Sequence, residues 1–140
     1  MGKVQILAVL TMDGCLSSEL YDKAHQDLCL DRCGLDEIRK KALYCVTPDY
    51  SISMLHEWRK EGTNIRYLAE ATPDTADYIN GLLRMHAVDE IILYTVPFIS
   101  GSGQHFFKSA LPEQHWTLSS LKSFPNGVCR IIYSLDKTAR

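Results

Sequence analysis

Apolar residues are almost continuous over residues 4–10, where only Gln5 interrupts the run. A run of this kind is typical of a strand that is covered on both faces, as in a parallel sheet. Shorter apolar segments at residues 43–47, 65–69 and 89–96 predict further strands. The pattern therefore predicts a sheet whose first strand is buried on both sides.

The segments between these strands have the spacing of amphipathic helices. A serine at position 17 or 18 can cap a helix to about residue 30, and Gly34 offers a place for that helix to end. A second helix is expected from Ser51 to Gly62, with inward-facing Met54, Leu55 and Trp58. A third is expected to start at Thr72-Pro73, because proline is favoured at the first helical position. Its apolar stripe comprises Ala76, Ile79, Leu82 and Leu83.

Two strand-like segments, residues 116–124 and 128–135, close the chain around Asn126-Gly127. Asn-Gly is a strong hairpin signal because both residues tolerate a positive φ. Alternating strands and helices followed by a hairpin predict a single α/β domain over residues 1–140. We expect three layers: a mostly parallel sheet, helices on both faces, and a C-terminal antiparallel β-hairpin.

Composition and charge narrow the class of protein. The chain has 140 residues, of which 46% are hydrophobic, and 15 basic against 17 acidic residues give a net charge of -2. No broad basic surface is implied, so we expect no nucleic-acid partner. No apolar run is long enough to cross a membrane, and the first residues do not form a signal peptide. We therefore expect a cytoplasmic protein without a membrane partner.

The cysteines and histidines form no metal motif. The cysteines number five, an odd count, and with no signal peptide we expect reduced thiols. Cys29 and Cys33 could share a helix face, but further ligands with suitable spacing are missing, so we expect no metal. The histidines are scattered, and only His105 lies beside a candidate ligand loop. We expect it to be a surface or edge histidine.

Two loops are candidates for ligand binding. Asp13 follows the first strand, where its carboxylate could accept hydrogen bonds from an NH-rich substrate. The alternative is a turn aspartate that bonds to its own backbone. After the fourth strand, Gly101, Ser102 and Gly103 form a loop that a ligand could approach closely, because glycine has no Cβ. The alternative there is a flexible connector.

The junction at residues 68–74, between the third strand and its helix, is a poor candidate for a pyrophosphate site. It has no glycine, Pro73 lacks a donor N–H, and Glu70 and Asp74 add negative charge. Another part of the chain would have to compensate.

Two sequence blocks resemble the dihydrofolate reductase-like family, and within it the reductase domain of the riboflavin-pathway bifunctional deaminase-reductase. Residues 6–14 are similar to that family's first strand, which ends in Ser-x-Asp-Gly. Residues 88–107 are similar to its Val-Asp-Glu strand, Ala-Pro, Gly-Gly-Gly and Leu-Phe sequence. The hairpin at residues 123–128 also fits.

The resemblance implies a terminal hairpin of swapped order, NADPH-dependent hydride transfer and often a homodimer. In the riboflavin branch the substrate is a phosphoribosylamino-pyrimidine. The resemblance also implies that Thr11, Asp13 and Gly14 line the substrate and nicotinamide pocket, with Asp13 as the catalytic candidate. By the same likeness, the cofactor-binding candidates are Thr47, Gly101, Ser102 and Gly103.

The chain departs from the family at its cofactor motifs. Glu70-Ala71-Thr72-Pro73 stands where the family has a Gly-Gly pair. Thr47 matches the hydroxyl of the family's Ser-Arg, but Pro48 and Asp49 follow it. Asp49 would repel a 2′-phosphate and suits an unphosphorylated ribose, so both NADPH and NADH stay open.

These observations support two functions. The first is an NAD(P)H-dependent reductase of a pyrimidine- or pteridine-like substrate, in which the cofactor carries the redox chemistry. The second is a non-catalytic relative that has lost the dinucleotide site and binds a small ligand or a protein partner. Residues 11–14 favour the first, and the missing glycines favour the second. The reductase function requires Asp13 to meet Gly101 and Gly103 around a shared cavity.

Overall fold

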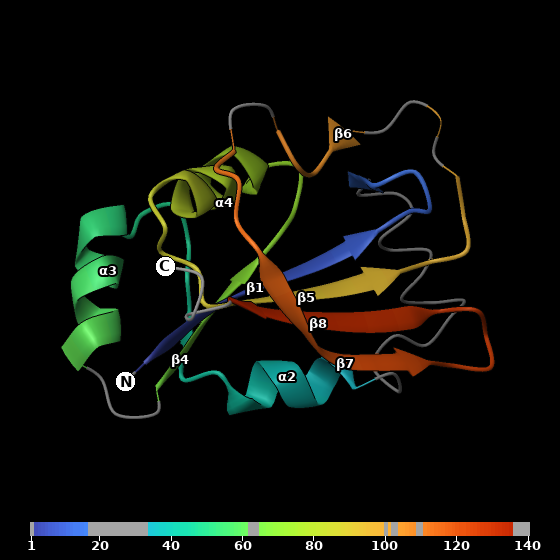
Figure 1. The fold of residues 1–140 in the computed structure, drawn as a ribbon, viewed down its shortest axis with the longest axis horizontal. Helices are drawn as coiled ribbons and strands as arrows, with labels where there is room; N and C mark the ends of the chain where they lie inside the picture. Colours follow the sequence, from blue (N-terminus) through green and yellow to red (C-terminus); the bar gives the residue numbers. More distant parts are fainter. Residues whose placement is uncertain are drawn as a thin grey trace.

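A computed structural model describes residues 2–16, 34–61, 65–99, 101, 104–108 and 111–135. Its main sheet has the strand order β3-β4-β1-β5-β8-β7 (Figure 1). These strands are β1 (Lys3–Leu10), β3 (Tyr44–Cys45), β4 (Arg66–Glu70), β5 (Glu90–Thr95), β7 (Trp116–Ser123) and β8 (Cys129–Leu135). The pairs β3–β4, β4–β1 and β1–β5 are parallel, whereas β5–β8 and β8–β7 are antiparallel. The mostly parallel sheet and its swapped-order hairpin are therefore confirmed, because β8 rather than β7 pairs with β5.

Helices cover both faces of the sheet (Figure 1). Helix α2 (Leu35–Lys41) packs its Leu35 on the face that carries Leu7 and Val9 of β1. Helices α3 (Ile52–Glu61) and α4 (Ala76–Arg84) pack on the opposite face. This arrangement confirms the predicted three layers. No helix in the described part of the chain is both long and apolar enough to cross a membrane.

The first strand is covered on both sides, as its apolar run predicts. Every residue from Val4 to Leu10 is buried. Successive side chains of a strand point to opposite faces, so Ile6 and Ala8 enter the core beneath α3 and α4, while Leu7 and Val9 enter the core beneath α2. Gln5 is the polar exception, and its amide donates a hydrogen bond to Glu90 Oε1 at 2.8 Å.

The helices differ from the prediction in two places. Gly34, with φ 86°, precedes the first residue of α2, a helix that the sequence did not predict. The expected helix from position 17 or 18 to residue 30, with Cys29 and Cys33, lies outside the described residues. In α3, Leu55 is fully buried as predicted, but Met54 is 46% exposed, so its inward placement is wrong.

Helix α4 buries its predicted stripe of Ala76, Ile79, Leu82 and Leu83. The helix begins later than Thr72-Pro73 suggests, because a turn occupies the intervening residues. The amides of Thr75 and Ala76 both donate to the Thr72 carbonyl, at 3.1 and 3.0 Å. Thr72 therefore starts the turn that leads into α4.

The terminal hairpin turns at Asn126-Gly127, as predicted, but only Gly127 uses a positive φ, of 90°. The Gly127 amide donates to the Phe124 carbonyl at 3.1 Å, and the Phe124 amide donates to the Val128 carbonyl at 2.9 Å. This is a loop in which a type I turn is followed by a left-handed glycine, and proline is favoured at its second position. Pro125 occupies that position and explains why Asn126 keeps a negative φ.

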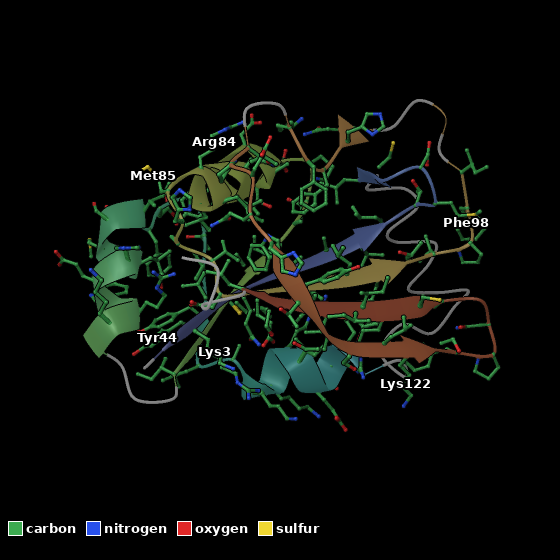
Figure 2. The ribbon with its side chains drawn as sticks, in the orientation of Figure 1. Lys3, Tyr44, Arg84, Met85, Phe98 and Lys122 are labelled. Carbon is green, nitrogen blue, oxygen red and sulfur yellow. The ribbon has the colours of Figure 1, made fainter. Side chains whose placement is uncertain are left out.

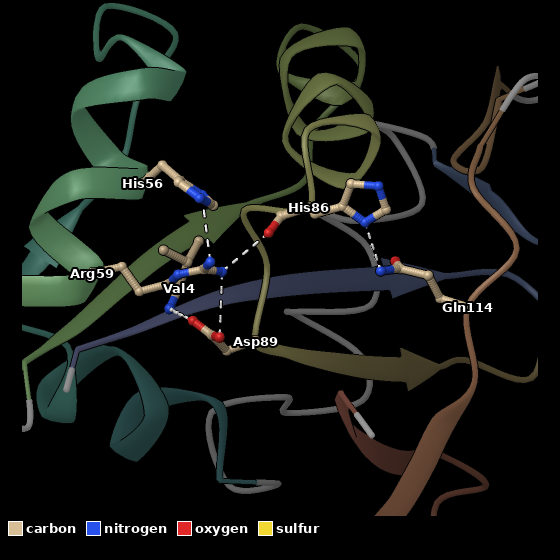
Figure 3. Close-up of polar contacts among 6 residues, drawn as sticks. All are labelled: Val4, His56, Arg59, His86, Asp89 and Gln114. Carbon is tan, nitrogen blue, oxygen red and sulfur yellow. Dashed lines mark hydrogen bonds and ion pairs between the residues drawn. The ribbon is translucent and has the colours of Figure 1, made fainter. Parts of the chain in front are cut away.

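The amino ends of β1 and β5 are tied to α3 by a nearly buried ion pair between Arg59 and Asp89 (Figure 3). Arg59 Nη1 lies 3.4 Å from Asp89 Oδ1, and Asp89 Oδ2 accepts a hydrogen bond from the Val4 amide at 2.9 Å. Arg59 Nη1 also donates to the His86 carbonyl at 3.2 Å, and its Nη2 lies 3.4 Å from His56 Nδ1. The Arg59 side chain of α3 thus pairs with Asp89, the residue before β5, and Asp89 in turn bonds to Val4 of β1.

Aromatic side chains pack beside this corner. Trp58 and Tyr44 both stack on Tyr67, with ring centroids 6.3 and 5.5 Å away. Burial raises the pKa of Tyr67, and the neighbouring Tyr44 raises it further. Burial also raises the pKa of Tyr78, and the neighbouring Tyr50 raises it further. These phenols therefore stay neutral within the apolar layer.

Candidate functional site

The loop after β1 is a tight turn that orients Asp13. The Thr11 side chain is buried, and its hydroxyl donates a hydrogen bond to Asp13 Oδ1 while it accepts one from the Cys15 amide at 3.1 Å. The Gly14 amide donates to the Thr11 carbonyl at 3.0 Å. Thr11 therefore holds the carboxylate of Asp13 in place from beneath.

The loop after β5 meets this turn. Asp13 Oδ2 accepts a hydrogen bond from the Gly101 amide at 3.0 Å, across 88 positions of sequence. The Met12 amide donates to the Phe98 carbonyl at 2.7 Å. Figure 2 shows Phe98 at the end of the sheet opposite Lys3, so the two loops meet beyond the carboxyl ends of β1 and β5. The structure thus brings Asp13 and Gly101 together, as the sequence predicts, and their binding of one ligand stays a prediction. Ser102 and Gly103 lie outside the described residues.

Gly14 and Gly101 are required by the backbone rather than by a close neighbour. Their φ values are 77° and 74°, a region that side chains with a Cβ rarely adopt. A Cβ built on either residue would meet no heavy atom of the described residues within 4 Å, its chain neighbours aside. The space beside both glycines is therefore not filled by described residues. We expected the Gly101 loop to allow close approach of a ligand, and this approach stays a prediction.

A short strand pair places a thiol and an imidazole next to this turn. Strand β2 (Cys15–Leu16) pairs antiparallel with β6 (Gln104–His105), and Cys15 lies opposite His105. Cys15 Sγ is 3.7 Å from His105 Nδ1. His105 is exposed, as predicted, whereas Cys15 is buried. Strands this short carry no periodicity, and only the position of His105 beside the glycine loop hinted at this contact.

Helix α4 anchors the second loop through Asn80, which is fully buried. Asn80 Nδ2 donates to the carbonyls of Phe106 and Ala76, both at 2.7 Å. Asn80 Oδ1 accepts a hydrogen bond from the Lys108 amide at 3.0 Å. The segment that follows the glycine loop is thereby fixed to a rigid helix.

The junction between β4 and α4 does not fit a pyrophosphate. The Ala71 amide donates to the Leu7 carbonyl at 2.7 Å, and the Thr72 amide donates to Thr75 Oγ1 at 2.8 Å. The Thr75 and Ala76 amides donate to the Thr72 carbonyl, and Pro73 has no N–H. A phosphate at a helix N-terminus requires amides that point toward it. Here the Ala71 amide is used by β1, and the amides of Thr72, Thr75 and Ala76 are used within the turn, which supports the sequence prediction.

The negative charge of Glu70 is compensated by an arginine of α2. Arg39 Nε donates to Glu70 Oε1 at 2.7 Å, and both side chains are about one third exposed. Glu70 therefore contributes less repulsion toward an anion than its place in the sequence suggests. The sequence did not reveal this pair because it did not predict α2.

Thr47 lies in an exposed turn after β3, and β4 separates β3 from β1 in the sheet. The Tyr50 amide donates to the Thr47 carbonyl at 3.0 Å, which closes this turn. The structure therefore does not bring Thr47 to Asp13. Among the described residues, no group of three or more His, Cys, Asp or Glu side chains is arranged to hold a metal ion.

Solved structures of the same fold include pyrimidine reductases. A pyrimidine reductase-like protein from Corynebacterium diphtheriae is 13% identical with a TM-score of 0.54, and the match covers 96% of this chain and 92% of that one. RibD from Acinetobacter baumannii is 10% identical with a TM-score of 0.60, covering 98% of this chain and 59% of that one. The diaminohydroxyphosphoribosylaminopyrimidine deaminase/5-amino-6-(5-phosphoribosylamino)uracil reductase from Thermotoga maritima is 10% identical with a TM-score of 0.56, covering 96% and 56%.

No protein-family model matches this sequence, and no curated protein matches it. At these identities the likeness shows the fold, and this fold is the reductase-like fold that the sequence blocks predicted. The chain spans somewhat more than half the length of the Acinetobacter and Thermotoga proteins.

Proposed function

We propose that this chain binds a small NH-rich heterocycle of the pyrimidine or pteridine class beyond the carboxyl ends of β1 and β5, with Asp13 as the anchor. The observation that carries this proposal is the carboxylate of Asp13, held between the Thr11 hydroxyl and the Gly101 amide. These two bonds orient the carboxylate, whose oxygens act as hydrogen-bond acceptors. The ring and amino N–H groups of an aminopyrimidine are matching donors.

Two further observations support the site and the ligand class. In open α/β sheets, ligands bind outside the carboxyl ends of the strands, and the Asp13 loop lies at such an end. Structural neighbours of this chain bear the names of pyrimidine reductases. Open space lies beside both Gly14 and Gly101, where an added Cβ would meet no atom of the described residues within 4 Å.

A second candidate is an NADPH- or NADH-dependent reductase of the same substrate class, with Asp13 as its catalytic residue. The pairing of Arg39 with Glu70 favours it, because a carboxylate at the cofactor junction is thereby compensated. The occupied amides of Ala71, Thr72, Thr75 and Ala76 instead favour a protein that has lost the dinucleotide site. Thr47, Gly101, Ser102 and Gly103 stay candidates for cofactor contact, and a dinucleotide would have to place its pyrophosphate elsewhere.

Isothermal titration with 5,6-diaminouracil and with pterin tests the anchor. We expect Asp13→Asn to weaken binding by at least about tenfold, because a charged acceptor is replaced by a neutral amide that also presents donors. Asp36→Asn, an exposed aspartate of α2, is the matched control and should leave the affinity unchanged. Equal affinities for Asp13→Asn and the unsubstituted chain, with equal melting temperatures, would refute the proposal.

The same titration with NADPH and NADH separates the two candidates. We expect no saturable heat with either cofactor up to about millimolar concentration, the weak end of specific affinities. Saturable binding, with oxidation of the cofactor when pterin is present as the hydride acceptor, would establish the reductase. In that case Asp49, exposed after β3, predicts little preference for NADPH over NADH.

We also propose that the chain forms a homodimer through the β7–β8 hairpin. Strand β7 is an edge strand, and its Leu118 and Leu121 are 52% and 64% exposed. They stand opposite Tyr133 and Ile131 of β8, so one face of the hairpin is continuously apolar. Exposed apolar patches of this kind mark interaction surfaces.

Light scattering after size exclusion tests this interface. We expect Leu121→Lys to shift the chain from dimer to monomer, because it places an ammonium within the apolar face. Leu43→Lys, also 63% exposed but outside the hairpin, should leave the dimer intact. A monomer in the unsubstituted chain would show the proposal to be wrong.

A further inference from the structure

A cavity of about 200 Å³ lies between α2 and the sheet and does not include the Asp13 loop. Gln5, Arg66 and Glu90 line its floor from three neighbouring strands, near the ends opposite Asp13. Lys41 lines it from α2, and Arg130 from β8. The pocket is therefore separate from the proposed heterocycle site and is built from both a helix and the sheet.

Basic side chains dominate the charge of this cavity. Arg66, Lys41 and Arg130 line it, and no carboxylate in the described ranges forms an ion pair with any of them. Glu90 also lines the cavity, but it accepts a hydrogen bond from Gln5 at 2.8 Å and its Oε2 lies 3.9 Å from Lys3 Nζ. The exposed Glu37 of α2 is the other acid of the lining. The pocket thus has an excess of positive charge.

Arg130 carries the strongest sign of a missing partner. Its Nε is shielded from solvent and has no hydrogen-bond acceptor among the residues that the structure describes. Buried polar atoms in folded proteins nearly always have a partner, and an exception needs an explanation. The absence of a side chain at Gly34 makes space for this guanidinium, because a Cβ on Gly34 would lie 2.8 Å from Arg130 Nη1. The fold thus accommodates the guanidinium, but its Nε has no acceptor among the described residues.

The remaining lining residues indicate the chemical class of the ligand. Ile38, Ile92 and Ile132 supply apolar surface around the charged groups. A guanidinium pairs through two parallel N–H groups with a planar carboxylate. Glu37 and Glu90 disfavour a dianion such as phosphate, since like charges repel at close range. We propose that this pocket binds a small monocarboxylic acid, whose carboxylate is held by Arg130 and whose apolar body contacts the isoleucines.

Benzoate, benzamide and inorganic phosphate are the probes for this proposal, followed by isothermal titration and by amide shifts in NMR spectra. Benzoate and benzamide have nearly the same shape, so their difference isolates the carboxylate charge. We expect saturable binding of benzoate, at least about tenfold weaker binding of benzamide, and weaker binding of phosphate than of benzoate. The amides of Gly34, Ile92 and Ile132 should shift with benzoate.

Arg130→Met should weaken benzoate binding by at least about tenfold, because the apolar stem stays while the charge is removed. Lys60→Met is the matched control: Lys60 lies on α3, on the opposite face of the sheet, does not line the cavity, and should leave the affinity within about twofold. Equal binding of benzoate and benzamide, tighter binding of phosphate, or unchanged binding by a folded Arg130→Met variant would each overturn the proposal. Because Asp13 is untouched, binding of 5,6-diaminouracil should survive in Arg130→Met.

Discussion

Replacing Asp89 with alanine is expected to lower the free energy of unfolding by about 3–5 kcal/mol, the cost of breaking a buried ion pair by removing one partner. Asp89 pairs with Arg59 at 3.4 Å, and the side chains are only 12% and 8% exposed. Its second oxygen accepts the Val4 amide at 2.9 Å. The variant would leave a nearly buried guanidinium without its carboxylate. It would also remove the side chain that links Arg59 of α3 to the Val4 amide of β1.

Urea unfolding followed by circular dichroism measures this effect. Asp36→Ala is the matched control, because Asp36 also forms an ion pair, with Lys40 at 3.3 Å, but both side chains are more than half exposed. Exposed pairs of this kind contribute about 0.3–0.5 kcal/mol. Similar losses in Asp89→Ala and Asp36→Ala would mean that the corner in Figure 3 contributes no more than a surface pair.

Asp89 shows that a block of sequence resemblance can contain residues that stabilise the fold as well as residues that line a candidate site. Residues 88–107 resemble a reductase block, yet Asp89 caps the amide of Val4 and Glu90 accepts a hydrogen bond from Gln5. Both side chains act at the amino end of β1, far from the Asp13 loop. Part of the resemblance over residues 88–107 therefore comes from residues that attach β5 to β1, which is a property of the fold.

The long elements were predictable because their periodicity is strong. Strand β1 with its continuous burial, the stripe of α4 and the terminal hairpin all follow from patterns that extend over seven or more residues. Strands β2 and β6 have two residues each and carry no pattern. Helix α2 was missed because Gly34 reads as a helix end, although its left-handed conformation here precedes a helix.

The same limit applies to the candidate site. The meeting of Asp13 and Gly101 follows from two parallel neighbouring strands, whose carboxyl ends must lie at the same edge of the sheet. The contact of Cys15 with His105 depends on the unpredicted pair β2–β6. The compensation of Glu70 depends on Arg39 of the unpredicted α2, so the sequence analysis overestimated the repulsion at the junction between β4 and α4.

Asn80 links this site to the core, and Asn80→Ala is expected to cost about 2–4 kcal/mol of the free energy of unfolding. The variant removes three hydrogen bonds of a fully buried side chain. It also leaves the Phe106 carbonyl and the Lys108 amide without the partner that α4 supplies. An unmade hydrogen bond at a buried group costs more than a made one contributes, which sets the upper part of this range.

The loss should be local as well as global, because Asn80 is the polar tie between α4 and the segment after the glycine loop. We expect the Lys108 amide to exchange with solvent much faster in Asn80→Ala, while amides of β1 keep their protection relative to the new global stability. Asn126→Ala is the control, since Asn126 bonds to Val128 within an exposed turn, at 3.2 Å. If Lys108 exchanges no faster than the amides of β1, residues 104–108 are held by the packing of Phe106 alone, and Asn80 does not position the loop that meets Asp13.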